Sequence, residues 1–243
     1  MERVDLCYAA GRMACFSAAP CKGHLHALLL IFANCKKHDK SKLVFDHHKK
    51  DWSSVKWVEY DWKCFYENIT GKTLPPNMPE ARGKSVQLNL CCDAAHATYL
   101  QTRRSTTGFI FFLNGTPIMW YSKRQNTLEG STFGSEFVAA KIAIKMNDAI
   151  RYKLRMMGIP LDGPTNCFCD NKSVVTNATI PHSTLNKKHN AIAYHKVRES
   201  VASQAVRIAH EKGQNNLSDV LTKFLGYKLF GRYIECILFR GLL

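Results

Sequence analysis

Apolar and polar residues alternate along residues 86–93, which predicts a strand with one buried face. Asp93 lies at the end of this strand, on its polar face. Two runs rich in phenylalanine and β-branched residues follow, over 107–113 and 116–122. The Asn114-Gly115 pair between them predicts a tight hairpin in which both turn residues take positive φ angles. The pattern therefore predicts a strand followed by a β-hairpin.

After a polar loop the period changes from that of a strand to that of a helix. Apolar residues recur at Phe133, Phe137 and Ile144, which predicts a helix over about 132–157 with Glu136 on its second turn. The rest of the pattern predicts, in order, a strand over 166–170, a helix over 172–178, a basic helix over 186–203, a strand over 205–210 and a helix over 217–225. This order of elements indicates an α/β fold.

A stretch with three prolines, residues 74–79, is typical of a linker and divides the chain. The part before it is predicted to be mainly helical, with a helix over 24–35 and a short strand over 43–45. Trp52, Trp57 and Trp62 recur just before the linker, and core packing explains them more simply than stacking on bases. We expect an N-terminal appendage (1–46), a linker region (47–84), a main domain (85–226) and an apolar tail (227–243) that packs as a helix.

The formal net charge of the 243-residue chain is +15, which is large for its size. Residues 85–243 carry 20 Lys+Arg against 10 Asp+Glu. Such a basic chain favours a polyanionic partner, and nucleic acid is the commonest one. A basic protein without such a partner is the simpler alternative.

The ten cysteines include no Cys-x-x-Cys pair, so their spacing favours neither a zinc site nor a disulfide framework. Cys167 and Cys169 are two residues apart and would share one face of a strand, which is a core pattern. The N-terminus lacks the features of a signal peptide, and the apolar run over 27–33 is too short to span a bilayer. We therefore expect no membrane partner and a reducing compartment, cytoplasmic or nuclear, rather than secretion.

Four acids lie where predicted elements begin or end: Asp93, Glu136, Asp170 and Asp219. In an α/β sheet such positions converge at one edge of the fold. Four carboxylates together repel one another and need cations, and oxygen ligands in this number suit magnesium. Two magnesium ions about 3.5–4 Å apart are the usual device for in-line attack on a phosphodiester. The acids therefore predict a metal-dependent site for phosphodiester chemistry.

Eight short motifs carry a resemblance to a known family. They stand in the order CCDAAHA (91–97), RRSTTG (103–108), SKRQ (122–125), STFGSEF (131–137), FCDN (168–171), KH (188–189), YHKVRE (194–199) and LSDVLTK (217–223). Together they resemble the ribonuclease H domain of copia-type long-terminal-repeat retrotransposon Pol polyproteins, over about residues 85–226. The segment RVDLCYA (3–9), with the chain that follows as far as residue 45, is similar to the part after the reverse-transcriptase palm in those polyproteins.

This resemblance implies a ribonuclease H-like fold, with a mixed five-stranded sheet that contains three antiparallel strands and is flanked by helices. It also implies cleavage of the RNA strand of an RNA–DNA hybrid with two Mg²⁺ ions, which Mn²⁺ could replace. The four catalytic and metal-binding acids of the family map onto Asp93, Glu136, Asp170 and Asp219. Ala95 and Gly134 stand where the family often has an additional acid, and both departures leave the ligand set whole.

Basic residues within these motifs are candidates for contacts with nucleic acid: Arg103, Arg104, Lys123, Arg124, Lys188 and His189. A solvated surface explains exposed basic residues equally well. His210 precedes Asp219 by nine residues, where a histidine could move protons, although a solvent-facing strand-end histidine is the simpler interpretation. His189 could likewise orient the substrate or have only a structural role.

Two functions stay open at this point. The first is a hybrid-specific endonuclease, which the intact set of four acids favours. The second is a truncated, inactive remnant of a retrotransposon that only binds nucleic acid. The sequence contains no Tyr-x-Asp-Asp motif, so we assign it no polymerase activity. The resemblance implies the C-terminal part of a retrotransposon polyprotein, with a polymerase domain absent from this sequence as a partner. An integrase-like nuclease is disfavoured by the fourth acid and by the motifs around the hairpin.

Overall fold

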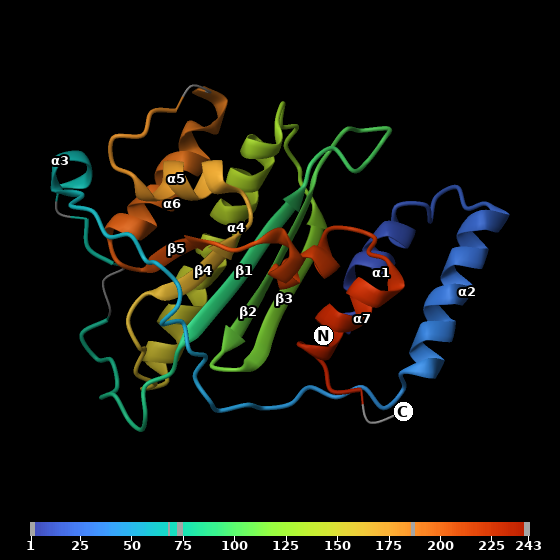
Figure 1. The fold of residues 1–243 in the computed structure, drawn as a ribbon, viewed down its shortest axis with the longest axis horizontal. Helices are drawn as coiled ribbons and strands as arrows, with labels where there is room; N and C mark the ends of the chain where they lie inside the picture. Colours follow the sequence, from blue (N-terminus) through green and yellow to red (C-terminus); the bar gives the residue numbers. More distant parts are fainter. Residues whose placement is uncertain (1–2, 68, 72–74, 186–187, 241–243) are drawn as a thin grey trace.

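A mixed sheet of five strands forms the centre of the fold (Figure 1). The computed structural model describes residues 3–67, 69–71, 75–185 and 188–240. The strand order is β3-β2-β1-β4-β5; the β3–β2 and β2–β1 pairs are antiparallel, whereas the β1–β4 and β4–β5 pairs are parallel. The strands are β1 (Leu88–Ala95), β2 (Thr106–Leu113), β3 (Thr116–Arg124), β4 (Thr165–Cys169) and β5 (Val206–His210). This arrangement confirms the predicted ribonuclease H-like sheet.

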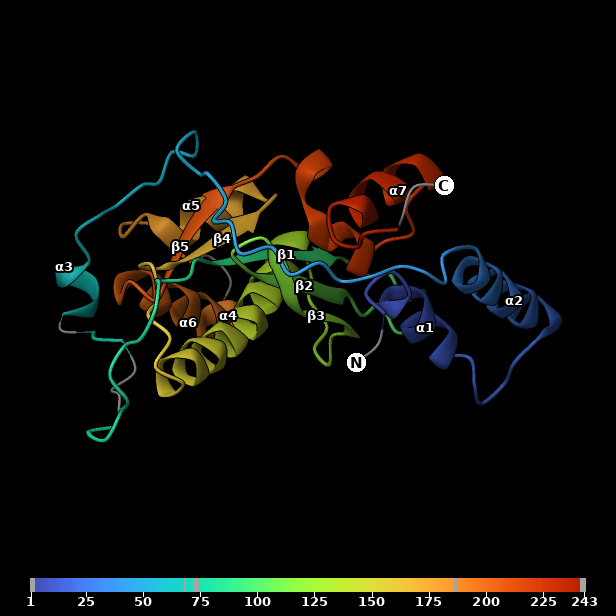
Figure 2. The ribbon, with the colours of Figure 1, turned by 90° about the horizontal axis from the view of Figure 1, so that it is seen from below.

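Helices lie on both sides of this sheet (Figure 2). They are α1 (Cys7–Ala14), α2 (Lys22–Lys37), α3 (Lys63–Tyr66), α4 (Thr132–Met156), α5 (Lys172–Thr179), α6 (Ala191–Ala202) and α7 (Tyr227–Glu235), with the short 3₁₀ helices η1 (Lys188–Asn190), η2 (Gly213–Asn215) and η3 (Leu217–Leu221). The long helix predicted over about 132–157 is thus confirmed as α4.

Helices α4 and α6 cover one face of the sheet and form the larger core with it. Leu90, Phe109 and Phe111 point from the strands into this core, and Phe137 meets them from α4. All four side chains are fully buried, and burial of each contributes roughly 1.5–3 kcal/mol to stability. Ser131 caps the start of helix α4, since its Oγ accepts a hydrogen bond from the Gly134 N–H at 3.2 Å. The cap and the apolar stripe together fix where α4 starts, and therefore where Glu136 lies.

The N-terminal and C-terminal segments share a second core on the other face of the sheet. Val4 lies just before α1, and Tyr233 and Ile234 belong to α7. These side chains pack with Ile110 of β2 and Leu221 of η3, and each is at most 2% exposed. Because of this packing, η3 lies next to β1 and β2, and α1 lies next to β3.

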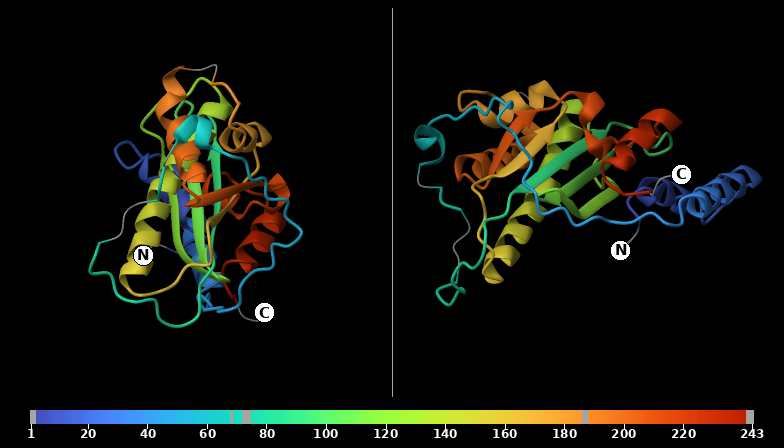
Figure 3. Two further views of the ribbon diagram at one scale, coloured as in Figure 1. Left: turned by 90° about the vertical axis from the view of Figure 1, so that its left-hand side faces the viewer. Right: turned by 60° about the horizontal axis from the view of Figure 1, so that its bottom comes forward.

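The segment between α2 and α3 runs along the outside of the sheet (Figure 3). Trp52 packs on Phe168 of β4, with ring centroids 4.5 Å apart, and the Arg207 guanidinium of β5 lies 4.1 Å from the ring centroid of Trp57. Trp62 is 7% exposed and joins the larger core. The tryptophans therefore pack on the fold, as the simpler interpretation predicted.

Three predicted elements differ from the structure. The strand over 43–45 is wrong: an isolated bridge joins Lys42 to Phe239, and no strand of the described residues pairs with this exposed segment. The helix over 217–225 is also wrong, since only the 3₁₀ helix η3 forms and it ends at Leu221. The basic helix begins at Ala191 instead of residue 186; residues 186 and 187 lie outside the described residues.

The predicted hairpin forms, but its turn differs from the expectation. Asn114 has a φ of 53°, whereas Gly115 is not among the residues with positive φ. Gly115 instead allows a close approach, because a Cβ atom there would overlap the carboxylate of Asp46. The Gly115 N–H donates a hydrogen bond to the carbonyl oxygen of Asp46 at 3.3 Å. The hairpin turn thus contacts the segment between α2 and α3 at Asp46.

All ten cysteines are free thiols. Cys167 and Cys169 are at most 1% exposed, which confirms that they belong to the core. Their neighbour across the sheet is Cys92, whose Sγ lies 3.0 Å from that of Cys169. Among the described residues, no helix is both long and apolar enough to cross a membrane.

Candidate active site

Three of the predicted acids meet at one edge of the sheet. Asp93 lies near the end of β1, Asp170 directly follows β4, and Asp219 belongs to η3. Each offers a carboxylate oxygen, and these oxygens all lie within 4.8 Å of one another. The convergence has a simple cause, because β1 and β4 are parallel neighbours whose carboxyl ends meet at the same edge. The sequence pattern thus located three acids that the fold brings together.

Glu136, the fourth acid, faces this group from the second turn of α4 and is only 6% exposed. It lies outside the set of oxygens within 4.8 Å. Burial, followed by the charges of Asp93 and Asp170, raises the pKa of Glu136 to about 10. Burial and these like charges therefore favour the protonated form of Glu136 when no cation is bound. The negative charge of the clustered carboxylates is therefore not fully balanced by nearby positive charge.

The other acids show the same crowding. Burial and then the charge of Asp93 raise the pKa of Asp219 to about 6. Burial and then Asp93 also raise the pKa of Asp170. Such shifts from burial and like charges are typical of clustered carboxylates in functional sites.

Lys223 supplies a positive charge inside this cluster, a role that the sequence reasoning did not assign to it. Its Nζ lies 2.9 Å from Asp219 Oδ1 and 3.3 Å from Asp93 Oδ2. Burial lowers the pKa of Lys223, but Asp93, Asp219 and Asp170 outweigh it and raise the pKa above its ordinary value. Its position four residues after Asp219 was the available signal. Next to it, the Thr222 hydroxyl donates a hydrogen bond to Asp93 Oδ2.

A network of side chains attaches η3 to the sheet. Asn216 precedes η3, and its Oδ1 accepts hydrogen bonds from the N–H and the hydroxyl of Ser218, the latter at 2.6 Å. The Nδ2 of Asn216 donates to the carbonyl oxygen of Cys92, next to Asp93, at 3.1 Å. The position of Asp219 relative to Asp93 is therefore set by buried hydrogen bonds.

Gly108 allows the final close approach between η3 and the sheet. It pairs with Asp93 across the β1–β2 ladder. A Cβ atom there would overlap the side chain of Thr222, lie 2.9 Å from Leu221 Cβ and lie 3.1 Å from the carbonyl oxygen of Ser218. Only glycine leaves room for η3 at this distance.

Gly108→Ala is expected to lower the free energy of unfolding by about 1–3 kcal/mol, the usual range for overpacking. It should also weaken metal binding, because η3 and Asp219 must move away from Asp93. Thermal unfolding and titration with Mg²⁺ measure the two effects. Gly130→Ala is the matched control, since a Cβ at Gly130 meets no atom within 4 Å. Equal stability and metal affinity in both variants would contradict the prediction.

Comparison with known proteins shows which sequences this chain resembles. No family model matches the chain. It is 31% identical over 156 residues to the Pol polyprotein of transposon RE1 from Arabidopsis thaliana, covering 64% of this chain and 11% of that protein. It is 26% identical over 183 residues to the Pol polyprotein of transposon TNT 1-94 from Nicotiana tabacum, covering 75% and 13%. This chain is therefore similar to parts of these retrotransposon Pol polyproteins.

The resemblance found in the sequence motifs is thereby confirmed. The chain spans only about a tenth of the length of these Pol relatives. Among solved structures, LC11-RNase H1 from compost, in complex with an RNA/DNA hybrid, matches with a TM-score of 0.44 at 12% identity, covering 56% of this chain and 94% of that one. At this level of similarity the match assigns no function.

The predicted nucleic-acid contacts of this chain fall into two groups. Arg103 and Arg104 lie in the loop after β1, and Lys123 and Arg124 end β3 at the same edge of the sheet. All are at least partly exposed. The second group, Lys188 and His189, forms the start of η1 near α4, and both side chains are exposed.

The two histidines singled out earlier both lie near acids. His189 Nε2 is 3.6 Å from Glu129 Oε2. His210 is exposed, and its Nε2 donates a hydrogen bond to the backbone carbonyl oxygen of Asp170 at 3.1 Å. His210 is thus solvent-facing, as the simpler interpretation predicted, and also adjoins the acids. A role in proton transfer stays a prediction for both residues.

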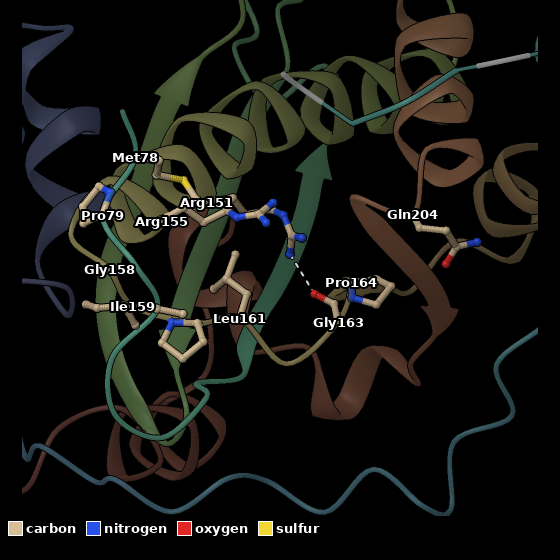
Figure 4. A pocket seen from close by; sticks show the side chains of 12 residues that line it. Met78, Pro79, Arg151, Arg155, Gly158, Ile159, Leu161, Gly163, Pro164 and Gln204 are labelled. Carbon is tan, nitrogen blue, oxygen red and sulfur yellow. Dashed lines mark hydrogen bonds between the residues drawn. The ribbon is translucent and has the colours of Figure 1, made fainter. Parts of the chain in front are cut away.

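The pocket in Figure 4 lies at the other end of the sheet from the acids, where α4 ends. Its volume is about 400 Å³, and Arg151 and Arg155 reach into it. Arg151 Nη1 donates a hydrogen bond to the carbonyl oxygen of Gly163 at 3.0 Å. None of the four acids lines this pocket, so the candidate active site is the open edge around Asp93.

Proposed function

We propose that this chain is a magnesium-dependent endonuclease that cleaves the RNA strand of RNA–DNA hybrids. The observation that carries the proposal is the set of three carboxylate oxygens within 4.8 Å of one another, with buried Glu136 facing them. The similarity to Pol polyproteins supports the same activity, because the motifs of this chain that resemble their ribonuclease H domain contain all four acids.

The donor set fits magnesium. All four side chains offer carboxylate oxygens, the ligands that hard divalent cations prefer. Lys223 is the one cationic side chain that forms an ion pair with Asp93 or Asp219 in the described part of the chain. The raised pKa values of Glu136, about 10, and Asp219, about 6, indicate that positive charge is in short supply. Asp93, Asp170 and Asp219 would hold a first ion and Glu136 would help to hold a second; Mn²⁺ could take the same places.

When bound, magnesium activates a water molecule and stabilises the leaving oxygen of a phosphodiester. The residues of the chain orient the acids and bind the substrate. Thr222 holds the Asp93 carboxylate through its hydroxyl group, and Asn216 holds η3 against β1. The basic residues of the same edge, Arg103, Arg104, Lys123 and Arg124, together with Lys188 and His189, bind phosphates of the hybrid.

A cleavage assay on an RNA–DNA hybrid with labelled RNA tests this function. The expected result is magnesium-dependent cleavage of the RNA strand that a chelator stops, with no cleavage of matched DNA–DNA or RNA–RNA duplexes. The alternative is an inactive remnant that only binds nucleic acid. A well-folded protein that binds the hybrid but never cleaves it, with either Mg²⁺ or Mn²⁺, would favour that alternative.

Binding of the hybrid is expected to weaken about tenfold when the salt concentration doubles from about 50 to 100 mM. The reason is counterion release, with a slope of about −0.9 in log affinity per phosphate neutralised, for about four phosphates. The excess of 20 Lys+Arg over 10 Asp+Glu in residues 85–243 supplies the charge. Fluorescence anisotropy in the presence of a chelator measures it. An affinity that does not change with salt would contradict this prediction.

A further inference from the structure

Tyr99 lies between two arginines that come from distant parts of the chain. The guanidinium of Arg12, in α1, lies 4.2 Å from the ring centroid of Tyr99, and that of Arg124, at the end of β3, lies 5.2 Å from it. Cys15 also reaches this place, with its Sγ 3.9 Å from the Tyr99 hydroxyl. The ring of Tyr99 attracts each guanidinium group through a cation–π interaction, whereas the two positive charges repel one another.

Neither arginine has an acidic partner among the described residues. No ion pair of the described chain includes Arg12 or Arg124. The Nε and Nη1 atoms of Arg12 are buried and have no hydrogen-bond partner. Buried donors without an acceptor are unfavourable. Two guanidinium groups beside one ring, with the Arg124 side chain exposed, provide positive charge and donors for an anion that carries several acceptor oxygens.

The loop that carries Tyr99 is fixed relative to the acids. It begins directly after β1, which contains Asp93. The Tyr99 N–H donates to the carbonyl oxygen of Arg104 at 3.2 Å, and the Arg103 N–H donates to that of Tyr99 at 2.6 Å. Arg124 of β3 pairs with Thr106 of β2, and Thr106 in turn pairs with Ala95 of β1. Two strand spacings separate Arg124 from Ala95, on the order of 10 Å.

We propose that Arg12, Tyr99 and Arg124 form a clamp for a backbone phosphate of the bound nucleic acid, a few nucleotides from the acids. The inference rests on the proposed function for the identity of the polyanion. It extends the binding surface beyond the ribonuclease H-like part of the chain, because Arg12 belongs to the N-terminal appendage. The exposed guanidinium of Arg124 donates to the phosphate oxygens, Arg12 adds its positive charge beside them, and the ring of Tyr99 holds both groups in place.

The test measures hybrid affinity by fluorescence anisotropy in the presence of a chelator, so that cleavage plays no part. Arg12→Gln and Arg124→Gln are each expected to weaken binding about five- to tenfold and to reduce the salt slope by about one. The double variant should lose less than the product of the single losses, because both arginines serve one phosphate. Arg12→Lys should retain part of the affinity, since it keeps the charge but loses the planar fork.

Lys36→Gln is the matched control, because Lys36 is an exposed residue of α2 and its substitution removes the same charge. It should change affinity less than twofold. The melting temperature of each variant separates a binding defect from unfolding. If Arg12→Gln does not fold, Arg124→Gln alone tests the clamp, since Arg124 is exposed. Arginine variants that bind like the Lys36→Gln protein, or a wild type that binds no nucleic acid, would overturn the clamp.

The clamp and the proposed function can fail separately. A wild type that never cleaves hybrid, with arginine variants that still bind a nucleic-acid duplex more weakly, would keep the clamp and reject the nuclease. A wild type that cleaves hybrid, with arginine variants that bind and cleave as well as it does, would keep the nuclease and reject the clamp.

Discussion

Replacing Asp93 with asparagine is expected to reduce magnesium-dependent cleavage of an RNA–DNA hybrid at least about a thousandfold. The substitution keeps the shape of the side chain, and its Oδ1 can still accept the hydrogen bond from Thr222. It removes the charge at the centre of the acid cluster, where Asp93 adjoins Asp170 and Asp219. A metal site contributes several kcal/mol to transition-state stabilisation, and about 4 kcal/mol corresponds to this loss in rate.

Affinity for the hybrid should survive the same substitution. Binding depends on the arginines and lysines of the edge, whereas Asp93 repels the phosphates when no metal is present. Stability should also survive, because the charge of Asp93 contributes to raising the pKa values of both Glu136 and Asp219. With that charge removed, both pKa values should fall towards their ordinary range, and the metal-free protein should melt at the same or a higher temperature.

Cleavage, hybrid affinity and melting temperature should be measured together for the wild type and Asp93→Asn. Asp39→Asn is the matched control, since Asp39 is exposed and lies outside the acid cluster. It should leave all three quantities unchanged. An Asp93→Asn protein that still cleaves at a rate near that of the wild type would show that the family role does not transfer to Asp93.

The elements around the acids could be predicted because each rests on a local pattern. Alternation placed Asp93 at the end of a strand, and the helical period placed Glu136 on the second turn of α4. Parallel pairing of β1 with β4 then brings Asp93 and Asp170 together without further information. Where an acid sits at the end of a regular element, local sequence is enough to place it.

Contacts that depend on tertiary packing could not be predicted. The segment over 217–225 has a helical pattern, yet only five residues form η3, because Asn216 ties its start to Cys92 and Gly108 lets it approach β2. Lys223 reaches Asp93 only as a result of that packing. Arg12 and Tyr99 are 87 positions apart, and no local pattern connects them. Lys223 adds a positive charge to the site, which the sequence reasoning described mainly through its acids.

Lys223→Met is expected to tighten magnesium binding on the order of a hundredfold. The Nζ of Lys223 lies 2.9 Å from Asp219 Oδ1 and 3.3 Å from Asp93 Oδ2, so its charge competes with a cation for the same oxygens. Two unit charges 4 Å apart interact by about 4 kcal/mol at the effective dielectric constant of a protein surface, and a divalent ion roughly doubles this repulsion. The lysine side chain is 38% exposed and can turn towards solvent, so screening leaves a smaller part, about 2–3 kcal/mol.

Isothermal titration of the protein with Mg²⁺, without nucleic acid, measures this effect independently of cleavage. Lys223→Arg keeps the positive charge and should bind magnesium about as weakly as the wild type. Lys36→Met removes a lysine charge from α2, far from the acids in sequence, and should also leave the affinity unchanged. Without metal, Lys223→Met should melt at a lower temperature, because Asp93 and Asp219 lose their ion-pair partner. If its magnesium affinity equals that of the wild type or is weaker, Lys223 does not compete with the metal, and its charge serves another purpose at this edge.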